Sequence, residues 1–289
     1  GQDERLHSIA CSPDGRLLAT VSLSGAFVVW DAGSHKMLHW FPGEPGQCNI
    51  AFSPDSQWLT SGSYDGGVAL WEARSGQQVL KPAGHAARVF AVAFGPDGRT
   101  LLTGSDDSTV LMWDLRPGTE LKHAGDMARL WADLAESDAA AAYKAIWQLA
   151  DRPELTVPFL KARLTPAKPM DRERLRKSLD HLDSNKFEER EAASKALTTL
   201  GDAIEPELRH ELSQAPSAEK RSRLQTLLKA ATGQGSAEDA RQARAVVALT
   251  WAKTPEALQL LRDLAGGAPH ARLTQEARTA LKHLDSDQK

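Results

Sequence analysis

The chain has few of the residues that mark disulfide frameworks, metal sites or membrane spans. It holds 2 cysteines in 289 residues, Cys11 and Cys48, too few for a disulfide framework, and no CxxC or Cys/His cluster suggests zinc. We expect two buried, reduced thiols. No run of about 18 apolar residues is present, so no membrane span is expected. No apolar signal segment stands at the start, which favours a cytoplasmic protein.

Motifs of common enzyme classes are also missing. No GxxxxGK[ST], GxGxxG, GxSxG or HExxH stands in a suitable context. The adjacent carboxylates Asp106–Asp107 and Glu188–Glu189 do not face each other as neighbours in sequence, which argues against general acid–base pairing. We expect no catalytic residue, no cofactor and no metal ion.

An excess of positive charge is lacking too, which disfavours nucleic-acid binding. The net charge is -3, with 9 Lys+Arg against 13 Asp+Glu in residues 1–124 and 26 against 25 in the remainder. Basic clusters occur at Arg172–Lys177 and Lys220–Arg223, but acidic or polar residues interrupt them and no aromatics accompany them. A solvated helix face is the expected state of both clusters, and nucleic-acid binding is kept as the weaker alternative.

What the sequence does contain is an internal repeat. Ser12–Gly15 returns as Ser53–Ser56 and as Gly95–Gly98, at steps of 41 and then 42 residues. The pair Trp30–Asp31 returns with the same two steps as Trp71–Glu72 and Trp113–Asp114. Because two independent markers keep one spacing, the first 124 residues are predicted to hold three copies of one structural unit.

Each unit is predicted to form four short strands. In the third unit the strands are Arg88–Phe94, Thr100–Gly104, Thr109–Trp113 and, more weakly, Glu120–His123. These runs are rich in Val, Leu, Thr and Phe, as strands are. The Pro-Asp-Gly between the first two supplies the fixed φ of proline and the free φ of glycine that a tight turn uses.

At these residues the chain resembles the WD-repeat family of β-propellers. The resemblance implies a buried tetrad of Trp, Ser/Thr, His and Asp in each blade, and the third unit has His85, Ser105, Asp107 and Trp113 at the matching positions. Such polar groups inside a packed sheet must find partners. The repeat thereby explains His85 and Asp107 better than a catalytic dyad does.

The first two units match the tetrad in part. The second keeps Ser63, Asp65 and Trp71 but has Gly43 where the resemblance implies His. The first keeps Ser22 and Trp30, with Ser24 in place of Asp. These two blades should be held less firmly.

Three blades are fewer than the four to eight that close a propeller. Open sheet edges invite pairing with other chains, so self-association through the open propeller edge is expected. The first residue is Gly1, not Met, and we expect the chain to be a piece of a longer protein.

After residue 124 the pattern becomes helical. We expect a helical junction over 125–170 and paired helices over 171–289. Ala193, Ala196, Leu197 and Leu200 are echoed 84 residues later by Ala277, Ala280, Leu281 and Leu284. This part resembles HEAT-like repeats. The order of the two parts resembles a group of large bacterial WD-repeat proteins, in which a kinase-like or sigma-factor-like region can lie upstream.

The sequence therefore predicts a β-then-α multidomain protein, with a partial three-bladed propeller followed by a HEAT-like tail. The leading hypothesis is a non-enzymatic scaffold that binds a protein or peptide through propeller loops and through the helical surface. The alternative is a regulatory tail of a larger enzyme, such as a kinase, whose catalytic domain lies upstream. Trp40 and Trp58 are candidate interface aromatics, with core packing as the equal alternative, whereas Trp131 and Trp147 are expected to seal the junction of the two parts.

Overall fold

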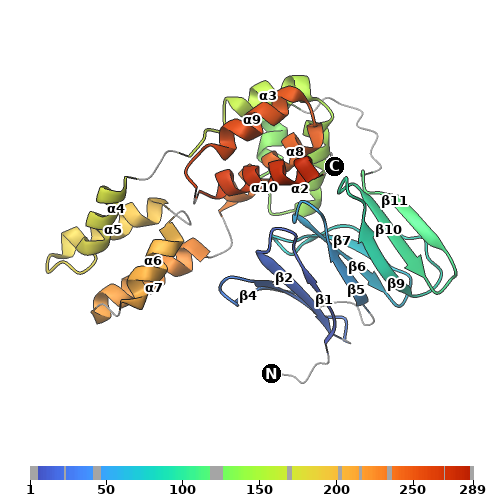
Figure 1. Ribbon diagram of the computed structural model, residues 1–289, viewed down its shortest axis with the longest axis horizontal. Helices are drawn as coiled ribbons and strands as arrows, with labels where there is room; N and C mark the ends of the chain where they lie inside the picture. The colour runs from blue at the N-terminus through green and yellow to red at the C-terminus, as the bar shows by residue number, and fades with distance from the viewer. Residues whose placement is uncertain are drawn as a thin grey trace.

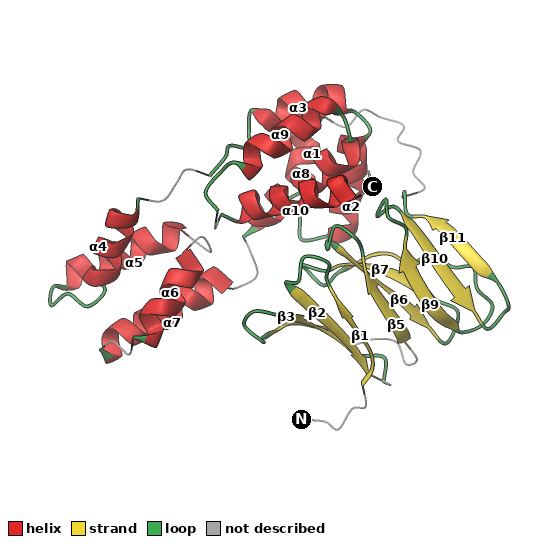
Figure 2. Cartoon of the chain, in the orientation of Figure 1, coloured by secondary structure: helices red, strands yellow, loops and turns green. Residues whose placement is uncertain are grey.

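A computed structural model describes residues 6–22, 24–41, 47–117, 126–167, 171–200, 204–214, 217–232, 236–269 and 271–286. Figures 1 and 2 show sheets followed by helices along the chain. The strands are β1 Leu6–Cys11, β2 Leu17–Ser22, β3 Phe27–Asp31, β4 Met37–Phe41, β5 Gln47–Phe52, β6 Trp58–Ser63, β7 Val68–Glu72, β8 Gln78–Leu80, β9 Val89–Phe94, β10 Thr100–Ser105 and β11 Val110–Asp114. The helices are α1 Met127–Asp133, α2 Ala139–Ala150, α3 Pro153–Lys161, α4 Arg172–His181, α5 Phe187–Leu200, α6 Glu205–Ser213, α7 Ala218–Thr232, α8 Ala237–Ala252, α9 Pro255–Ala265 and α10 Arg272–Ser286.

Each repeat unit forms its own antiparallel sheet, here called blades 1, 2 and 3. Blade 1 has the order β1-β2-β3-β4 and blade 2 the order β5-β6-β7-β8, which confirms four strands in these units. Blade 3 is described as β9-β10-β11. Its predicted fourth strand, Glu120–His123, lies outside the described residues.

The turn between the first two strands of a blade uses the same backbone in all three repeats. Gly15 and Gly98 have φ of 74° and 66°, and Ser56 takes their place in blade 2 with φ of 62°. Glycine adopts this left-handed region without the steric cost that Cβ imposes. The Pro-Asp-Gly pattern therefore predicted the turn correctly.

Neighbouring blades pack face to face. Between blades 1 and 2, the rings of Phe27 and Phe41 stack with centroids 4.1 Å apart. The ring of Trp71, from blade 2, meets both of them edge-on at 5.0 and 5.6 Å. Ala19, Val21 and the other apolar residues of this layer complete a small core. Because side chains alternate between the two faces along each strand, the apolar residues of one face all point into this interface.

Helix ends follow capping signals in the sequence. The Asp138 carboxylate accepts hydrogen bonds from the backbone N–H groups of the first turn of α2. Ser236 and Asp239 form a reciprocal capping box at the start of α8. Pro153 and Pro255 stand in the first turns of α3 and α9, where a missing N–H costs nothing. In the described part of the chain, no helix has both the length and the apolarity to cross a bilayer.

The helices have two separate cores. Helices α4–α7 enclose one, made largely of leucines such as Leu182, Leu197 and Leu224. Helices α1–α3 and α8–α10 enclose the other, which is continuous with buried residues of blades 2 and 3. The α4–α7 group stands to one side in Figure 1.

This grouping differs from the expected one. The sequence placed the junction at 125–170 and all later helices in one HEAT-like unit, whereas α8–α10 share their core with α1–α3. Hydrophobic periodicity gives the buried face of each helix and leaves its packing partner open. The domain boundaries and the HEAT-like character of the tail stay predictions.

Candidate protein-binding surface

The polar network of blade 3 is built around His85, whose side chain is fully buried. His85 Nδ1 lies 3.1 Å from Asp107 Oδ2 and also 3.1 Å from Thr109 Oγ1. Its Nε2 lies 2.7 Å from Thr103 Oγ1. Trp113 Nε1 donates to that same Thr103 hydroxyl at 2.8 Å. One hydroxyl thus joins His85 to Trp113, and the network ties β10 and β11 to the segment before β9.

The hydroxyl of this network is Thr103 and not the expected Ser105. Ser105 Oγ donates to the backbone carbonyl of Ala87 at 2.9 Å and accepts from the backbone N–H of Asp107 at 3.1 Å. Thr103 and Ser105 are two residues apart on one strand and therefore point to the same face. The family resemblance therefore does not distinguish the two hydroxyls. The position of the Trp113 ring does, because its Nε1 lies within hydrogen-bond distance of Thr103.

The same correction applies to the other blades. Trp71 Nε1 donates to Ser61 Oγ at 3.0 Å and Trp30 Nε1 to Thr20 Oγ1 at 3.1 Å, where Ser63 and Ser22 were expected. In all three blades the tryptophan and its hydroxyl are 10 residues apart. Ser22, Ser63 and Ser105 are likewise each 8 residues before the tryptophan, so spacing alone does not identify the bonded hydroxyl and the position of the ring does.

The expected hydroxyls serve the turns instead. Ser63 Oγ lies within hydrogen-bond distance of both the Asp65 carboxylate and the Gly67 carbonyl, to one of which it donates, and Ser22 pairs with Ser24 at 2.8 Å. The Gly43 position lies outside the described residues.

Hydrogen bonds set the ionisation of Asp107. The Thr109 hydroxyl and the backbone N–H groups of Thr109 and Ala86 donate to this carboxylate, which holds its pKa well below its ordinary value of 3.8. Asp107 is therefore a fixed anion at neutral pH. Because both ring nitrogens of His85 have partners within the blade, the network satisfies its own groups and its evident role is to hold the blade together.

Helices cover one end of the blades. Arg244 of α8 forms two 2.7 Å contacts with the Glu72 carboxylate of blade 2. Tyr143 of α2 donates to the Leu115 carbonyl at 2.8 Å, and Arg16 of blade 1 donates to Gln275 at 2.7 Å. On the blade side, Arg16 lies in the turn between the first and second strands. Glu72 ends a third strand and Leu115 directly follows one. Figure 1 shows α2, α8 and α10 above this end of the sheets.

An aromatic cluster seals this covered end. Trp58 of blade 2 meets Tyr143 edge-on at 4.8 Å, and Trp147 lies 4.7 Å from Trp251. Trp58 and Trp147 are buried. Trp147 therefore seals the junction as predicted, and for Trp58 the core-packing alternative holds.

The opposite end of the blades carries the remaining turns, here called the free end. It comprises the turns between second and third strands, around Gly25, Gly66 and Asp107, and the segments that lead into the first strands, such as His85–Arg88. Tyr64 is 46 % exposed here, and the Arg88 guanidinium lies 4.3 Å from the centre of its ring. Such stacking orients a cation and an aromatic ring together.

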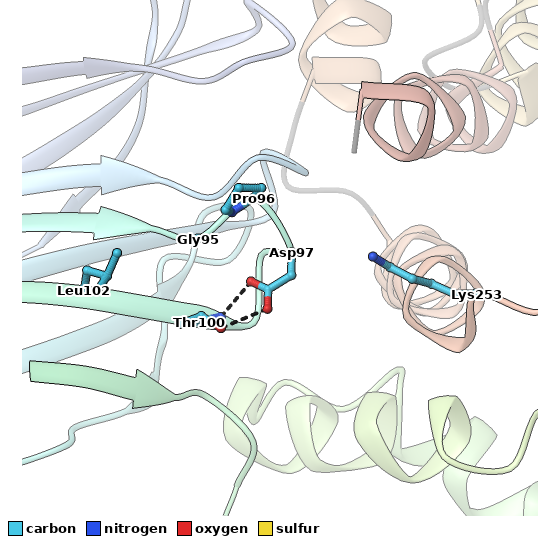
Figure 3. A pocket seen from close by; sticks show the side chains of 6 residues that line it. All are labelled: Gly95, Pro96, Asp97, Thr100, Leu102 and Lys253. Carbon is cyan, nitrogen blue, oxygen red and sulfur yellow. Dashed lines mark hydrogen bonds between the residues drawn. The ribbon is translucent and has the colours of Figure 1, made fainter. Parts of the chain in front are cut away.

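A shallow pocket of about 450 Å³ lies beside the turn between β9 and β10, at the covered end of blade 3 (Figure 3). Gly95, Pro96, Asp97, Thr100 and Leu102 line it from the blade, and Lys253 lines it from the end of α8. Asp97 is occupied by hydrogen bonds from the Thr100 hydroxyl at 2.8 Å and from the Arg99 and Thr100 backbone, as Figure 3 shows for Thr100.

Of the other residues singled out from the sequence, Trp40 is exposed and the second basic cluster forms ion pairs. Trp40 is 58 % exposed and stays an interface candidate. In the second basic cluster, Lys220 pairs with Glu211 at 2.7 Å and Arg223 with Glu191 at 2.7 Å. These pairs neutralise part of the charge that a nucleic-acid groove would need.

Of the two cysteines, the side chain of Cys11 is described and that of Cys48 lies outside the described residues. Cys11, expected to be buried, is exposed at the end of β1, where it lies beside Leu18 and Trp30 on one face of the sheet. In the described part of the chain, no group of three or more His, Cys, Asp or Glu is placed to hold a metal ion.

Comparison with known proteins agrees with the blade assignment. The family described as "WD domain, G-beta repeat" matches residues 1–31, 36–72 and 76–114. These residues are WD40 repeats, and the helical part lies outside the match. No curated protein matches the chain.

Two solved structures are similar to part of the chain. They are the structure of U3-55K, with 25% identity and a TM-score of 0.38, and the WD40 repeats of RRP9, with 25% identity and a TM-score of 0.37. Each match covers 40% of this chain and 37% of the other. The chain thus spans well under half the length of these structures.

Proposed function

We propose that the chain is a non-catalytic scaffold that binds a protein or peptide at the free end of its blades. The observation that carries the proposal is the division of the two ends. Helices occupy one end through buried contacts such as Arg244 with Glu72, whereas the free end presents turns fixed on WD40 repeats. Loops held on a rigid frame are suited to recognition.

The Tyr64–Arg88 pair is the proposed anchor of this surface. Tyrosine and arginine are enriched where protein interfaces concentrate binding energy. The stacked geometry, with 4.3 Å between the guanidinium carbon and the ring centre, reduces the conformational freedom that binding must remove. An acidic or aromatic side chain of a partner would complement the pair.

The experiment compares the wild-type chain with a Tyr64→Ser/Arg88→Ser variant. Proteins captured from a cell extract would be identified by quantitative mass spectrometry, and the Kd of a purified partner would then be measured by calorimetry. Losing two anchor side chains should weaken binding by about 10-fold or more.

The control is Leu155→Ser/Arg163→Ser, because both side chains are exposed and lie on helix α3 and just after its end, away from the free end. The control should leave Kd unchanged. Equal Kd values for wild type and the Tyr64/Arg88 variant would show that the partner does not bind through this pair, which would contradict the proposed binding at the free end.

A further inference from the structure

One face of blade 3 is uncovered where the same face of blades 1 and 2 is buried. In blade 1, Phe27 and Val29 are 0% exposed, and in blade 2 their equivalents Val68 and Leu70 are 1% exposed. The equivalents in blade 3, at the repeat steps of 41 and 42, are Val110 and Met112, which are 73% and 74% exposed. We call this the trailing face of a blade.

Within the chain, the next blade covers each trailing face. Phe27 and Phe41 of blade 1 pack on Trp71 of blade 2. Val89 of blade 3 lies so close to blade 2 that a Cβ added to Gly62 would come within 2.7 Å of its Cγ1. The trailing face of blade 3 is thus one half of an interface that the chain forms twice.

The turns of adjacent blades also touch. The Asp14 backbone N–H of blade 1 donates to Ser56 Oγ of blade 2 at 3.1 Å, and Pro54 of blade 2 lies near Gly98 of blade 3. The pocket at Gly95–Asp97 occupies the corresponding place beside the trailing face of blade 3 and shares Leu102 with it. By analogy with these turn contacts, a turn from a further blade would lie at this pocket.

The complementary surface lies at the other end of the repeat series. We call it the leading face of blade 1, the face that in blade 2 carries Trp71 and packs on blade 1. In blade 1 it carries Trp30, and Thr20, Val28 and Trp40 lie side by side across β2, β3 and β4. Trp40 is 58% exposed. Trp40 on the leading face of blade 1 and Val110 and Met112 on the trailing face of blade 3 are thus exposed at opposite ends of the described blade series.

We propose that two copies of the chain bind each other through these faces. The trailing face of blade 3 in each copy packs on the leading face of blade 1 in the other copy. Such a head-to-tail contact either closes or extends into a filament. Two copies of the three described blades make six, within the range of closed propellers, and the proposed assembly closes as a twofold dimer. The contact uses sheet faces, and the free end stays available, so this inference does not depend on the proposed function.

Light scattering coupled to size exclusion tests the dimer. At micromolar concentration the wild-type chain should have twice its mass of 31.4 kDa. Met112→Glu should weaken the dimer by about 100-fold or more, because it places an unpaired charge in an apolar interface. Leu155→Glu is the matched control, since Leu155 is 51% exposed on α3 and lies outside both faces. Circular dichroism would show that every variant remains folded.

Mixing two variants tests the head-to-tail arrangement. A Met112→Glu chain and a Trp40→Glu chain each spoil both interfaces of their own dimer. Their mixed dimer keeps one interface with two wild-type faces, so mixing should restore part of the dimer. A monomeric wild type, dissociation by Leu155→Glu, or species that grow with concentration beyond two copies would each overturn the proposal, as would a mixture that stays monomeric.

Discussion

Replacing Arg244 with methionine should destabilise the blade–helix unit more than most single substitutions would. Arg244 and Glu72 are a buried pair, with side chains 6% and 7% exposed. The guanidinium also donates to the Leu134 and Glu136 carbonyls at 2.8 and 2.9 Å. Removing the cation leaves a buried carboxylate without its partner, which costs about 3–5 kcal/mol.

The companion variants separate charge from packing. Arg244→Met/Glu72→Met removes both charges, and buried ion pairs replaced by apolar side chains are often neutral in stability. The two orphaned carbonyls still cost about 1 kcal/mol each, so the double variant should recover only part of the loss. Glu238→Gln, on the same helix with a half-exposed side chain, is the control and should change the free energy by less than about 0.5 kcal/mol.

Urea unfolding followed by tryptophan fluorescence provides the measurement. All 8 tryptophans lie outside residues 171–235, so the signal reports the blades and the helices packed on them, and helices α4–α7 do not contribute. A loss below about 1 kcal/mol for Arg244→Met, or a coupling energy near zero in the double-mutant cycle, would refute the reasoning.

Two further predictions concern the network of blade 3. Thr103→Val should reduce the unfolding free energy by about 2–4 kcal/mol, because it leaves both His85 Nε2 and Trp113 Nε1 without a partner. Ser105→Ala should cost about half as much, and a larger loss for Ser105→Ala in urea unfolding would contradict the assignment. Asp107 has a lowered folded-state pKa, so its stabilisation is present above its unfolded pKa and is lost as pH falls through the folded value. The stability difference between wild type and Asp107→Asn should therefore be constant near neutral pH and shrink in acid below about pH 4, and a difference that stayed constant there would count against a lowered pKa.

The repeat made the strands predictable from sequence. Regular steps of 41 and 42 residues, with Pro-Asp-Gly turns and alternating apolar residues, gave β9, β10 and β11 to within a residue or two. Such local signals depend on neighbouring residues only. The hydroxyl partner of Trp113 was misassigned because Thr103 and Ser105 share one face of β10, and only the ring's reach across the strand pair distinguishes them.

Contacts between the two parts of the chain were beyond the sequence. Arg244 and Glu72 are separated by 172 residues, and neither carries a local mark of burial. The insertion of α4–α7 between two sets of helices that share a core is equally non-local. The Tyr64–Arg88 pair of the free end also required the structure, because Tyr64 lies in a turn of blade 2 and Arg88 in the segment that leads into blade 3.

The three blades differ in the contacts that stabilise them. Blade 2 has a neighbour on each face and contributes Glu72 and Trp58 to the covered end. Blade 3 has one uncovered face, but its His85 network is complete. Among the described residues, blade 1 packs on blade 2 alone and has no histidine in its network, and it reaches the helices through Arg16. A partner on its leading face would therefore stabilise blade 1 most, because each blade's stability depends on apolar packing at both faces as well as on its internal hydrogen bonds.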